Sequence, residues 1–197
     1  MIEAGARRRE IDEVASELFH ANGYAATSVR DIARALDIQG ASLYAHVASK
    51  EDLLWSIVDA TATAFEERAE DALNDAQSGD PVDRLAALVE AHVEVVTTDP
   101  ERASVFITEW RHLSPDRRAA INDRRDAYER RFRDLIEDGI AVGALRRTDP
   151  AIAADFILSA LNGIPAWYRP DGRLSADRVT DHYVDLALRS LTEENPR

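Results

Sequence analysis

The sequence predicts an all-α protein with an N-terminal three-helix helix-turn-helix domain and a larger C-terminal helical domain. Apolar residues recur at three- and four-residue steps, and no stretch alternates between apolar and polar residues as a half-buried strand would. Residues 27–47 fit a short helix, a tight turn and a second short helix. Four prolines each follow a Ser or Asp that can cap a helix, so each is expected in a first turn: Pro81, Pro100, Pro115 and Pro150.

Three helices are expected before residue 48. The first, in REIDEVASELFHANGY, should end at Gly23, which can adopt a left-handed backbone, and its apolar stripe is Ile11, Val14, Ala15, Leu18 and Phe19. The second, in TSVRDIARALD, begins after Thr27 or Ser28 as the N-cap and is about two turns long. The third, GASLYAHV, carries Leu43 and Val47 in register.

The rest of the chain is expected to be helical as well. Ser49 caps a long helix that runs to about Gln77, and Glu51 and Asp52 lie in its first turn, where the helix dipole favours acidic residues. Later helices are expected at 81–98, 100–112, 115–140, 150–167 and 175–192.

Composition excludes several classes of protein. The 197 residues contain no cysteine, so disulfides, thiolate metal sites and cysteine nucleophiles are excluded. There is no Gly-rich phosphate loop and no H-E-x-x-H pair, and the histidines are isolated, so we expect no enzyme, no metal site and no cofactor. No signal-peptide pattern opens the chain, and its most apolar stretch is interrupted by Asp155 and Pro165. We therefore expect a soluble, cytoplasmic protein that does not span a membrane.

Charge is distributed unevenly. The formal net charge is -13, but residues 1–50 contain six Lys or Arg and seven Asp or Glu, a net of -1, which leaves -12 for the other 147 residues. Lys50 is the only lysine. The acidity of the C-terminal part favours solubility and keeps that part away from phosphates, whereas the N-terminal part is free to approach a polyanion.

The turn and the third helix are predicted to present small and polar side chains outward. A DNA major groove admits a helix only where the leading residues are small, as Gly40, Ala41 and Ser42 are, and the amide of Gln39 suits a base edge. Hydroxyl, imidazole and ammonium groups nearby suit phosphate contacts. The predicted DNA contacts are Thr27, Ser28, Arg30, Gln39, Gly40, Ala41, Ser42, Tyr44, His46 and Lys50. Any one of them alone is also explained as an ordinary surface residue.

Residues 7–55 closely resemble the N-terminal domain of the TetR family of transcriptional repressors. The matching text is ANGYAATSVRDIARALDIQGASLYAHVASKEDLLW, in which Val47 stands where the family usually has Phe. The resemblance implies a homodimer that binds a palindromic double-stranded DNA operator and is released by a small hydrophobic effector. It implies a DNA-binding domain at 1–50 and a ligand-binding and dimerisation domain at 51–197.

Two sets of residues in the larger domain are candidates for the roles that the resemblance implies. The ligand cavity could be lined by Phe65, His92, Phe106, Trp110, Tyr128 and Phe132, although each is equally explained as ordinary core or surface. Helix 175–192 is apolar on two sides and so needs two neighbours. The candidates for a four-helix dimer interface are Phe156, Ala160, Ile164, Val179, Tyr183 and Leu186; the alternative is that both sides of that helix are internal core.

The C-terminal text NGIPAWYRPDGRLSADRVTDHYVDL resembles a subset of the family that represses fatty-acid and sterol-ring catabolism in actinobacteria. The resemblance implies an acyl-CoA thioester as the effector, without assigning any residue to it. A drug-responsive repressor of an efflux gene is the alternative within the family, and a helical adaptor that does not bind DNA is the alternative outside it.

Overall fold

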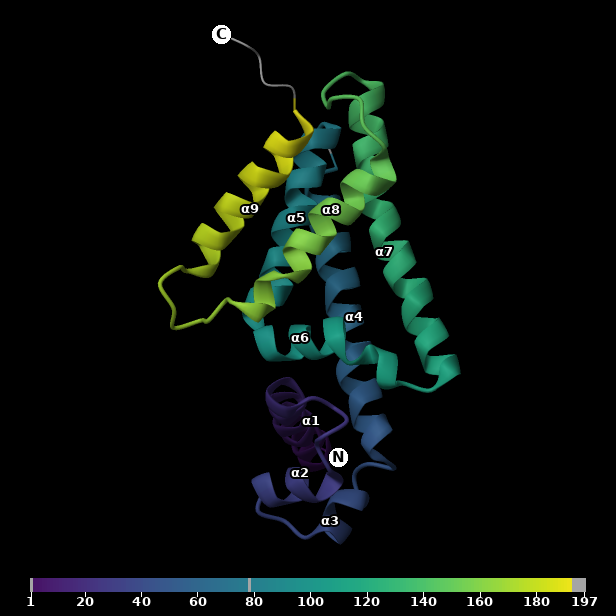
Figure 1. Ribbon diagram of the computed structural model, residues 1–197, viewed down its shortest axis with the longest axis vertical. Coiled ribbons are helices and arrows are strands. Elements are labelled where there is room, and N and C mark those ends of the chain that lie inside the picture. The colour runs from purple at the N-terminus through teal and green to yellow at the C-terminus, as the bar shows by residue number, and fades with distance from the viewer. Residues whose placement is uncertain (1, 78, 193–197) are drawn as a thin grey trace. The chain divides into compact units, whose positions relative to one another are not determined.

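The computed structural model describes residues 2–77 and 79–192, and every regular element in them is helical (Figure 1). No helix in these residues is long and apolar enough to cross a membrane. The elements are α1 (Ile2–Asn22), α2 (Val29–Ala35), α3 (Gly40–Tyr44), α4 (Lys50–Asp75), α5 (Pro81–Thr98), α6 (Pro100–Thr108), η1 (Trp110–His112), α7 (Pro115–Ala141), α8 (Pro150–Asn162), η2 (Ile164–Ala166) and α9 (Ala176–Leu191).

Helix starts follow the capping residues expected from the sequence. At α2 the Ser28 hydroxyl accepts the Asp31 N–H at 3.2 Å, and the Asp31 carboxylate accepts the Ser28 N–H at 3.0 Å, which forms a capping box. Asp80 and Asp149 cap α5 and α8, each just before the proline that opens the helix. After α1, Gly23 has a φ of +81°. The all-α prediction and these helix boundaries are confirmed.

Two of the expected helices are interrupted. The helix expected at 100–112 is α6 followed by the 3-10 helix η1, with Glu109 between them. The helix expected at 150–167 is α8 followed by η2, with Gly163 between them. Pro165 has no N–H with which to continue the hydrogen-bond ladder of α8, so the chain tightens into a 3-10 turn there.

The chain divides into two compact units that alternate along the sequence. The first contains residues up to Ala62 together with Glu101–Asn122, and the second contains Thr63–Pro100 together with the chain from Asp123 onward. The long helices α4 and α7 therefore contribute residues to both units. A functional boundary at residue 50 remains a prediction.

The first unit has an apolar core to which α1, α2, α3 and α4 contribute. Its largest buried side chains include Ile11, Phe19, Ile32, Leu43, Leu53, Leu54 and Ile57. Ala33 is also buried, and its small side chain allows α2 to pack closely against α1 and α3. The short helices are thus held by packing, because five to seven residues are too few to be stable as isolated helices.

In the second unit, α5 packs against α8, η2 and α9. Its buried residues include Leu85, Leu88, Val89, Val93 and Val96. Ile164 of η2 and Val179 of α9 are 0% and 1% exposed, so both belong to the core of this chain. Their assignment to an outward-facing dimer surface is therefore corrected: α9 turns one of its two apolar sides to the interior.

Candidate functional sites

Helix α3 presents small and polar residues to solvent. Leu43 is fully buried and Val47 is 3% exposed, and they anchor α3 and the turn after it in the core of the first unit. The Tyr44 side chain is 56% exposed. The exposed residues of this face are Gln39, Ala41, Ser42, Tyr44 and His46, and Gly40 between them has open space where a Cβ would lie.

A groove of about 400 Å³ lies between α2 and the start of α3. It is lined by Arg30, Ala33, Arg34, Asp37, Ile38, Gln39 and Gly40. The sequence-based set of DNA contacts omitted Arg34, whose side chain is 78% exposed and pairs with Asp31 at 3.2 Å. Its spacing of four residues from Arg30, which places both on one face of α2, was the signal that could have identified it.

Thr27 is not available for a DNA contact. Its side chain is 3% exposed, and its hydroxyl donates to the carbonyls of Gly23 at 3.0 Å and Leu18 at 3.1 Å. Thr27 therefore closes the end of α1, and we remove it from the predicted contacts. Ser28 remains exposed at the start of α2, although its hydroxyl donates to the Asp31 carboxylate at 2.6 Å.

The Lys50 ammonium group holds the loop between α1 and α2 by hydrogen bonds to its backbone. Its Nζ donates to the carbonyls of Tyr24 and Thr27, both at 2.8 Å, and lies 4.1 Å from the centroid of the Tyr24 ring. Partial burial lowers the pKa of Lys50. Two of the three ammonium hydrogens are thus used inside the unit, and one remains for another acceptor. The predicted role of Lys50 as a phosphate contact therefore becomes secondary to a structural role.

Four of the six residues predicted to line a ligand cavity form an aromatic cluster in the second unit. The centroid of the His92 ring lies 4.7 Å from that of the Phe65 ring and 6.5 Å from that of the Phe132 ring. The His92 Nδ1 is 3.2 Å from the Tyr128 hydroxyl oxygen. Burial raises the pKa of Tyr128 above its ordinary value. The His92 Nε2 is buried without a hydrogen-bond partner.

The other two predicted ligand residues belong to the first unit. Phe106 lies in α6 and is 6% exposed, and Trp110 opens η1 with the Arg111 guanidinium 5.0 Å from its ring. No three His, Asp or Glu side chains within residues 2–77 and 79–192 are grouped so that they could hold a metal ion.

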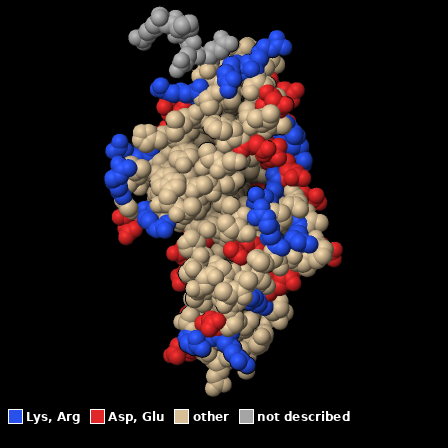
Figure 2. Space-filling view, viewed as in Figure 1, with Lys and Arg blue, Asp and Glu red and all other residues tan. Residues whose placement is uncertain are grey.

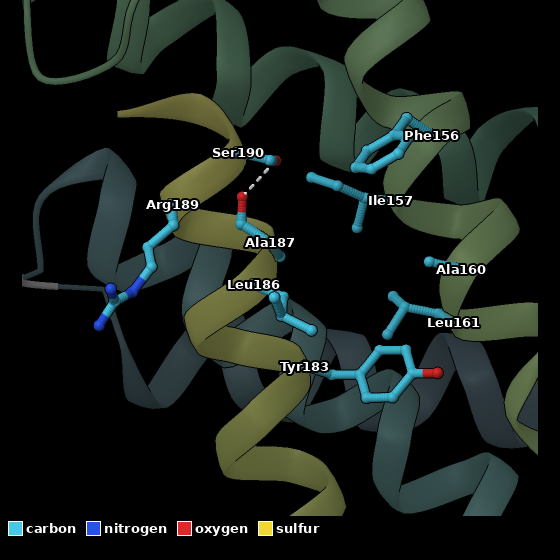
Figure 3. Close-up of a pocket in the computed structure, with 9 residues that line it drawn as sticks. All are labelled: Phe156, Ile157, Ala160, Leu161, Tyr183, Leu186, Ala187, Arg189 and Ser190. Carbon is cyan, nitrogen blue, oxygen red and sulfur yellow. Dashed lines mark hydrogen bonds between the residues drawn. The ribbon is translucent and has the colours of Figure 1, made fainter. Parts of the chain in front are cut away.

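An apolar surface covers α8 and α9 in the second unit. Figure 2 shows a broad area over these helices without Lys, Arg, Asp or Glu. Phe156 and Leu186 are 60% and 63% exposed there, on either side of a groove of about 380 Å³. Side chains from both helices face this groove, while Arg189 points away from it (Figure 3). Exposed apolar patches of this kind occur at protein–protein interaction sites and at ligand-binding grooves.

Two family models match the chain. One, described as bacterial regulatory proteins of the tetR family, matches residues 11–56 and so covers the helix-turn-helix. The other, described as the tetracyclin repressor-like C-terminal domain, matches residues 78–191, more than half of the 197 residues. The chain belongs to the TetR family. The two matches together cover the helix-turn-helix and most of the rest of the chain.

Relatives within the TetR family cover nearly the whole chain. The transcriptional repressor KstR2 of Mycobacterium tuberculosis is 30% identical over 194 residues, 98% of this chain and 96% of KstR2. The structure of that protein, described as a ketosteroid transcriptional regulator, covers 95% of this chain and 96% of its own with a TM-score of 0.88. PfmR of Thermus thermophilus is 34% identical and covers 94% and 99% of the two chains with a TM-score of 0.82.

AibR is a third similar structure, solved in complex with isovaleryl coenzyme A and operator DNA. It is 30% identical, with a TM-score of 0.81, and the match covers 91% of this chain and 97% of AibR.

The buried His92 should make the stability of this TetR-family chain depend on pH. Burial, with a smaller contribution from Arg125, lowers the pKa of His92 from 6.5 to about 3. Between these values the unfolded chain binds a proton that the folded chain does not, so the free energy of unfolding falls as pH falls, by ~1.4 kcal/mol per unit from this residue. Urea unfolding from pH 7 to pH 4 should show a shallower pH dependence for His92→Phe than for the wild type. The exposed His46→Phe is the control, and equal slopes for His92→Phe and the wild type would contradict the prediction.

Proposed function

We propose that the chain is a homodimeric DNA-binding repressor that a small hydrophobic effector releases from a palindromic operator. The observation that carries the proposal is the outward face of α3, where small and polar side chains lie beside a groove with two arginines. In this proposal α3 enters the major groove, and the side chains around it contact bases and phosphates. The proposed contacts are Ser28, Arg30, Arg34, Gln39, Gly40, Ala41, Ser42, Tyr44 and His46, with the remaining N–H of Lys50.

The second copy of the chain would cover the α8 and α9 surface. A two-fold axis through this surface would bring α8 and α9 of both protomers into a four-helix interface, in which each patch meets its own copy. With Ile164 and Val179 inside the protomer, the proposed interface consists of Phe156, Ala160, Tyr183 and Leu186. Its apolar character supports a stable dimer, because Arg189 is the one charged residue among those that line the groove and its guanidinium points away from it.

The effector is proposed to be an acyl-CoA thioester that binds near the aromatic cluster of the second unit. The cluster gathers buried apolar side chains against which an acyl chain or ring system would pack, and His92 Nε2 is a buried polar group without a partner. In this unit Arg124 of α7 is already paired with a carboxylate, because it donates to the two Glu66 oxygens at 2.7 and 2.6 Å. The thioester class is supported by AibR, which was crystallised with isovaleryl coenzyme A.

A titration of candidate effectors into the DNA-bound protein tests the effector proposal. Isovaleryl coenzyme A, longer acyl-CoA esters, the free acids and planar cationic drugs would each be added to the protein on a labelled duplex. We expect a thioester to change DNA affinity by roughly 5- to 150-fold, a coupling of about 1–3 kcal/mol. Release by planar drugs with no response to thioesters would instead favour a drug-responsive repressor of an efflux gene. A helical adaptor without DNA binding is disfavoured by the match over residues 11–56.

A further inference from the structure

A segment far along the chain is built into the same compact unit as the helix-turn-helix. Residues 109–117, which we call the docking segment, comprise Glu109 between α6 and η1, η1 itself, residues 113–114 and the start of α7. They contact the loop between α1 and α2 and the first turn of α4, which lie more than 60 residues earlier in the sequence. None of the docking segment belongs to the helix-turn-helix.

The first contact is to the peptide and ring of Tyr24. The Tyr24 N–H donates to Glu109 Oε2 at 3.1 Å, and the His112 ring stacks on the Tyr24 ring at 5.2 Å with an interplanar angle of 27°. His112 Nε2 lies 3.5 Å from the same Glu109 oxygen, and the Glu109 side chain is 18% exposed. A carboxylate that accepts a backbone N–H in partial burial makes a charge-assisted hydrogen bond, which is stronger than a neutral one.

The second contact is to the first turn of α4. The Ser114 N–H donates to Glu51 Oε1 at 3.0 Å, so a side chain of α4 caps the start of α7. Arg117 donates to Asp52 Oδ1 at 3.0 Å, and its guanidinium lies 5.3 Å from the Trp55 ring. The hydrogen bond from Ser114 and the charge of Arg117 lower the pKa of Glu51, which keeps the carboxylate ionised for this contact.

Both contacts act on the parts of the unit that fix α2 and α3. The loop that holds Tyr24 leads directly to Ser28, the N-cap of α2, and Lys50 holds the same loop through the Tyr24 and Thr27 carbonyls. The backbone of Tyr24 is therefore held on both sides, at its N–H by Glu109 and at its C=O by Lys50. With the Glu109 contact removed, the Tyr24 N–H would be left with solvent alone, and of the contacts from the docking segment to this loop only the His112 ring would remain.

We propose that Glu109 is a positioning residue for operator binding, which acts through Tyr24 to hold the start of α2 and thereby α3 in the DNA-binding geometry. The inference rests on the proposed function, because it assigns Glu109 a part in DNA binding by this helix-turn-helix. Glu109 itself touches no DNA. Its loss lowers the fraction of molecules in the competent geometry, and the apparent dissociation constant rises by the inverse of that fraction.

The test compares three variants of the full-length chain. Glu109→Ala removes the acceptor, Glu109→Gln keeps an oxygen that can accept the Tyr24 N–H, and Glu101→Ala is the control on an exposed position of α6. The probe is a fluorescein-labelled duplex recovered from random DNA by selection with the wild-type chain. Affinity would be measured at several salt concentrations, well below the unfolding temperature of each variant. Hydrogen exchange of the amides of residues 23–28 would be measured on the same samples without DNA.

We expect Glu109→Ala to weaken binding of this duplex about tenfold, with the salt slope unchanged because no phosphate contact is lost. Glu109→Gln should recover most of the affinity, and Glu101→Ala should match the wild type. Amide exchange at residues 23–28 should accelerate in Glu109→Ala only. Equal duplex affinity of Glu109→Ala and the wild type, or unchanged exchange in this loop, would overturn the inference and leave the proposed function standing. Failure of the wild-type chain to select any duplex would overturn the proposed function itself.

Discussion

Leu186→Glu is expected to make the protein monomeric and to weaken operator binding by at least about a hundredfold. The Leu186 side chain is 63% exposed on the groove between α8 and α9, and it would occur twice in a two-fold interface. In the proposed dimer the substitution removes two apolar side chains from the interface, each contributing up to about 1.5–3 kcal/mol if fully buried there, and places two like charges in an apolar contact. A single protomer would then bind one half-site without the gain in effective concentration that its partner provides.

Sedimentation equilibrium and DNA anisotropy on the same samples would measure both effects. Asp181→Lys is the matched control. It also changes the charge at an exposed position of α9, and Asp181 does not line the groove. The control should remain dimeric and bind DNA as the wild type does. A Leu186→Glu protein that stays dimeric would show that α8 and α9 do not form the interface.

Lys50→Met is expected to weaken binding to all DNA sequences alike, by at least about tenfold, and to lower thermal stability. The Tyr24 and Thr27 carbonyls would each lose a charged donor at 2.8 Å, and the loop before α2 would lose an anchor. If the remaining ammonium hydrogen also reaches a phosphate, the salt slope should fall by roughly one unit per protomer.

Gln39→Ala is the matched comparison for Lys50→Met. Gln39 is exposed at the N-cap of α3 and makes no side-chain capping hydrogen bond, so its loss should leave stability unchanged and relax preference at particular base pairs. Thermal unfolding and a binding selection with each variant would separate the two roles. A Lys50→Met protein of unchanged stability and altered base preference would contradict the structural role assigned to Lys50.

The helical architecture could be predicted because its determinants are local. Proline after a capping Asp marks the starts of α5 and α8, and Gly23 marks the end of α1, within one or two residues of each boundary. The outward face of α3 was also predictable, since small residues next to two apolar anchors leave few ways to pack such a short helix. The break at Glu109 was missed because an apolar pattern at helical spacing continues through it. The break at Gly163 was predictable, since Gly163 and Pro165 indicate a loosened or kinked end for the helix expected at 150–167.

The roles of single side chains could not be predicted where they depend on residues distant in sequence. Lys50 suits a phosphate contact by chemistry, but its hydrogen-bond partners lie 26 and 23 residues away. Thr27 also suits such a contact, and one of its two partners lies 9 residues away. The pairing of Glu109 with Tyr24 spans 85 residues, and no local pattern encodes it. The two apolar sides of α9 were visible in the sequence, but only the packing of α5 against it shows which side is internal.

Selection of DNA by the full-length chain, followed by native mass spectrometry of the complex, tests the central claim most directly. The selected duplex should be a near-palindrome whose half-sites lie about one helical turn, or a multiple of it, apart. The complex should contain at least one pair of chains on the duplex, and Gln39→Ala should shift the selected bases. A monomer that binds random duplexes without sequence preference would contradict the claim that this chain reads an operator as a dimer.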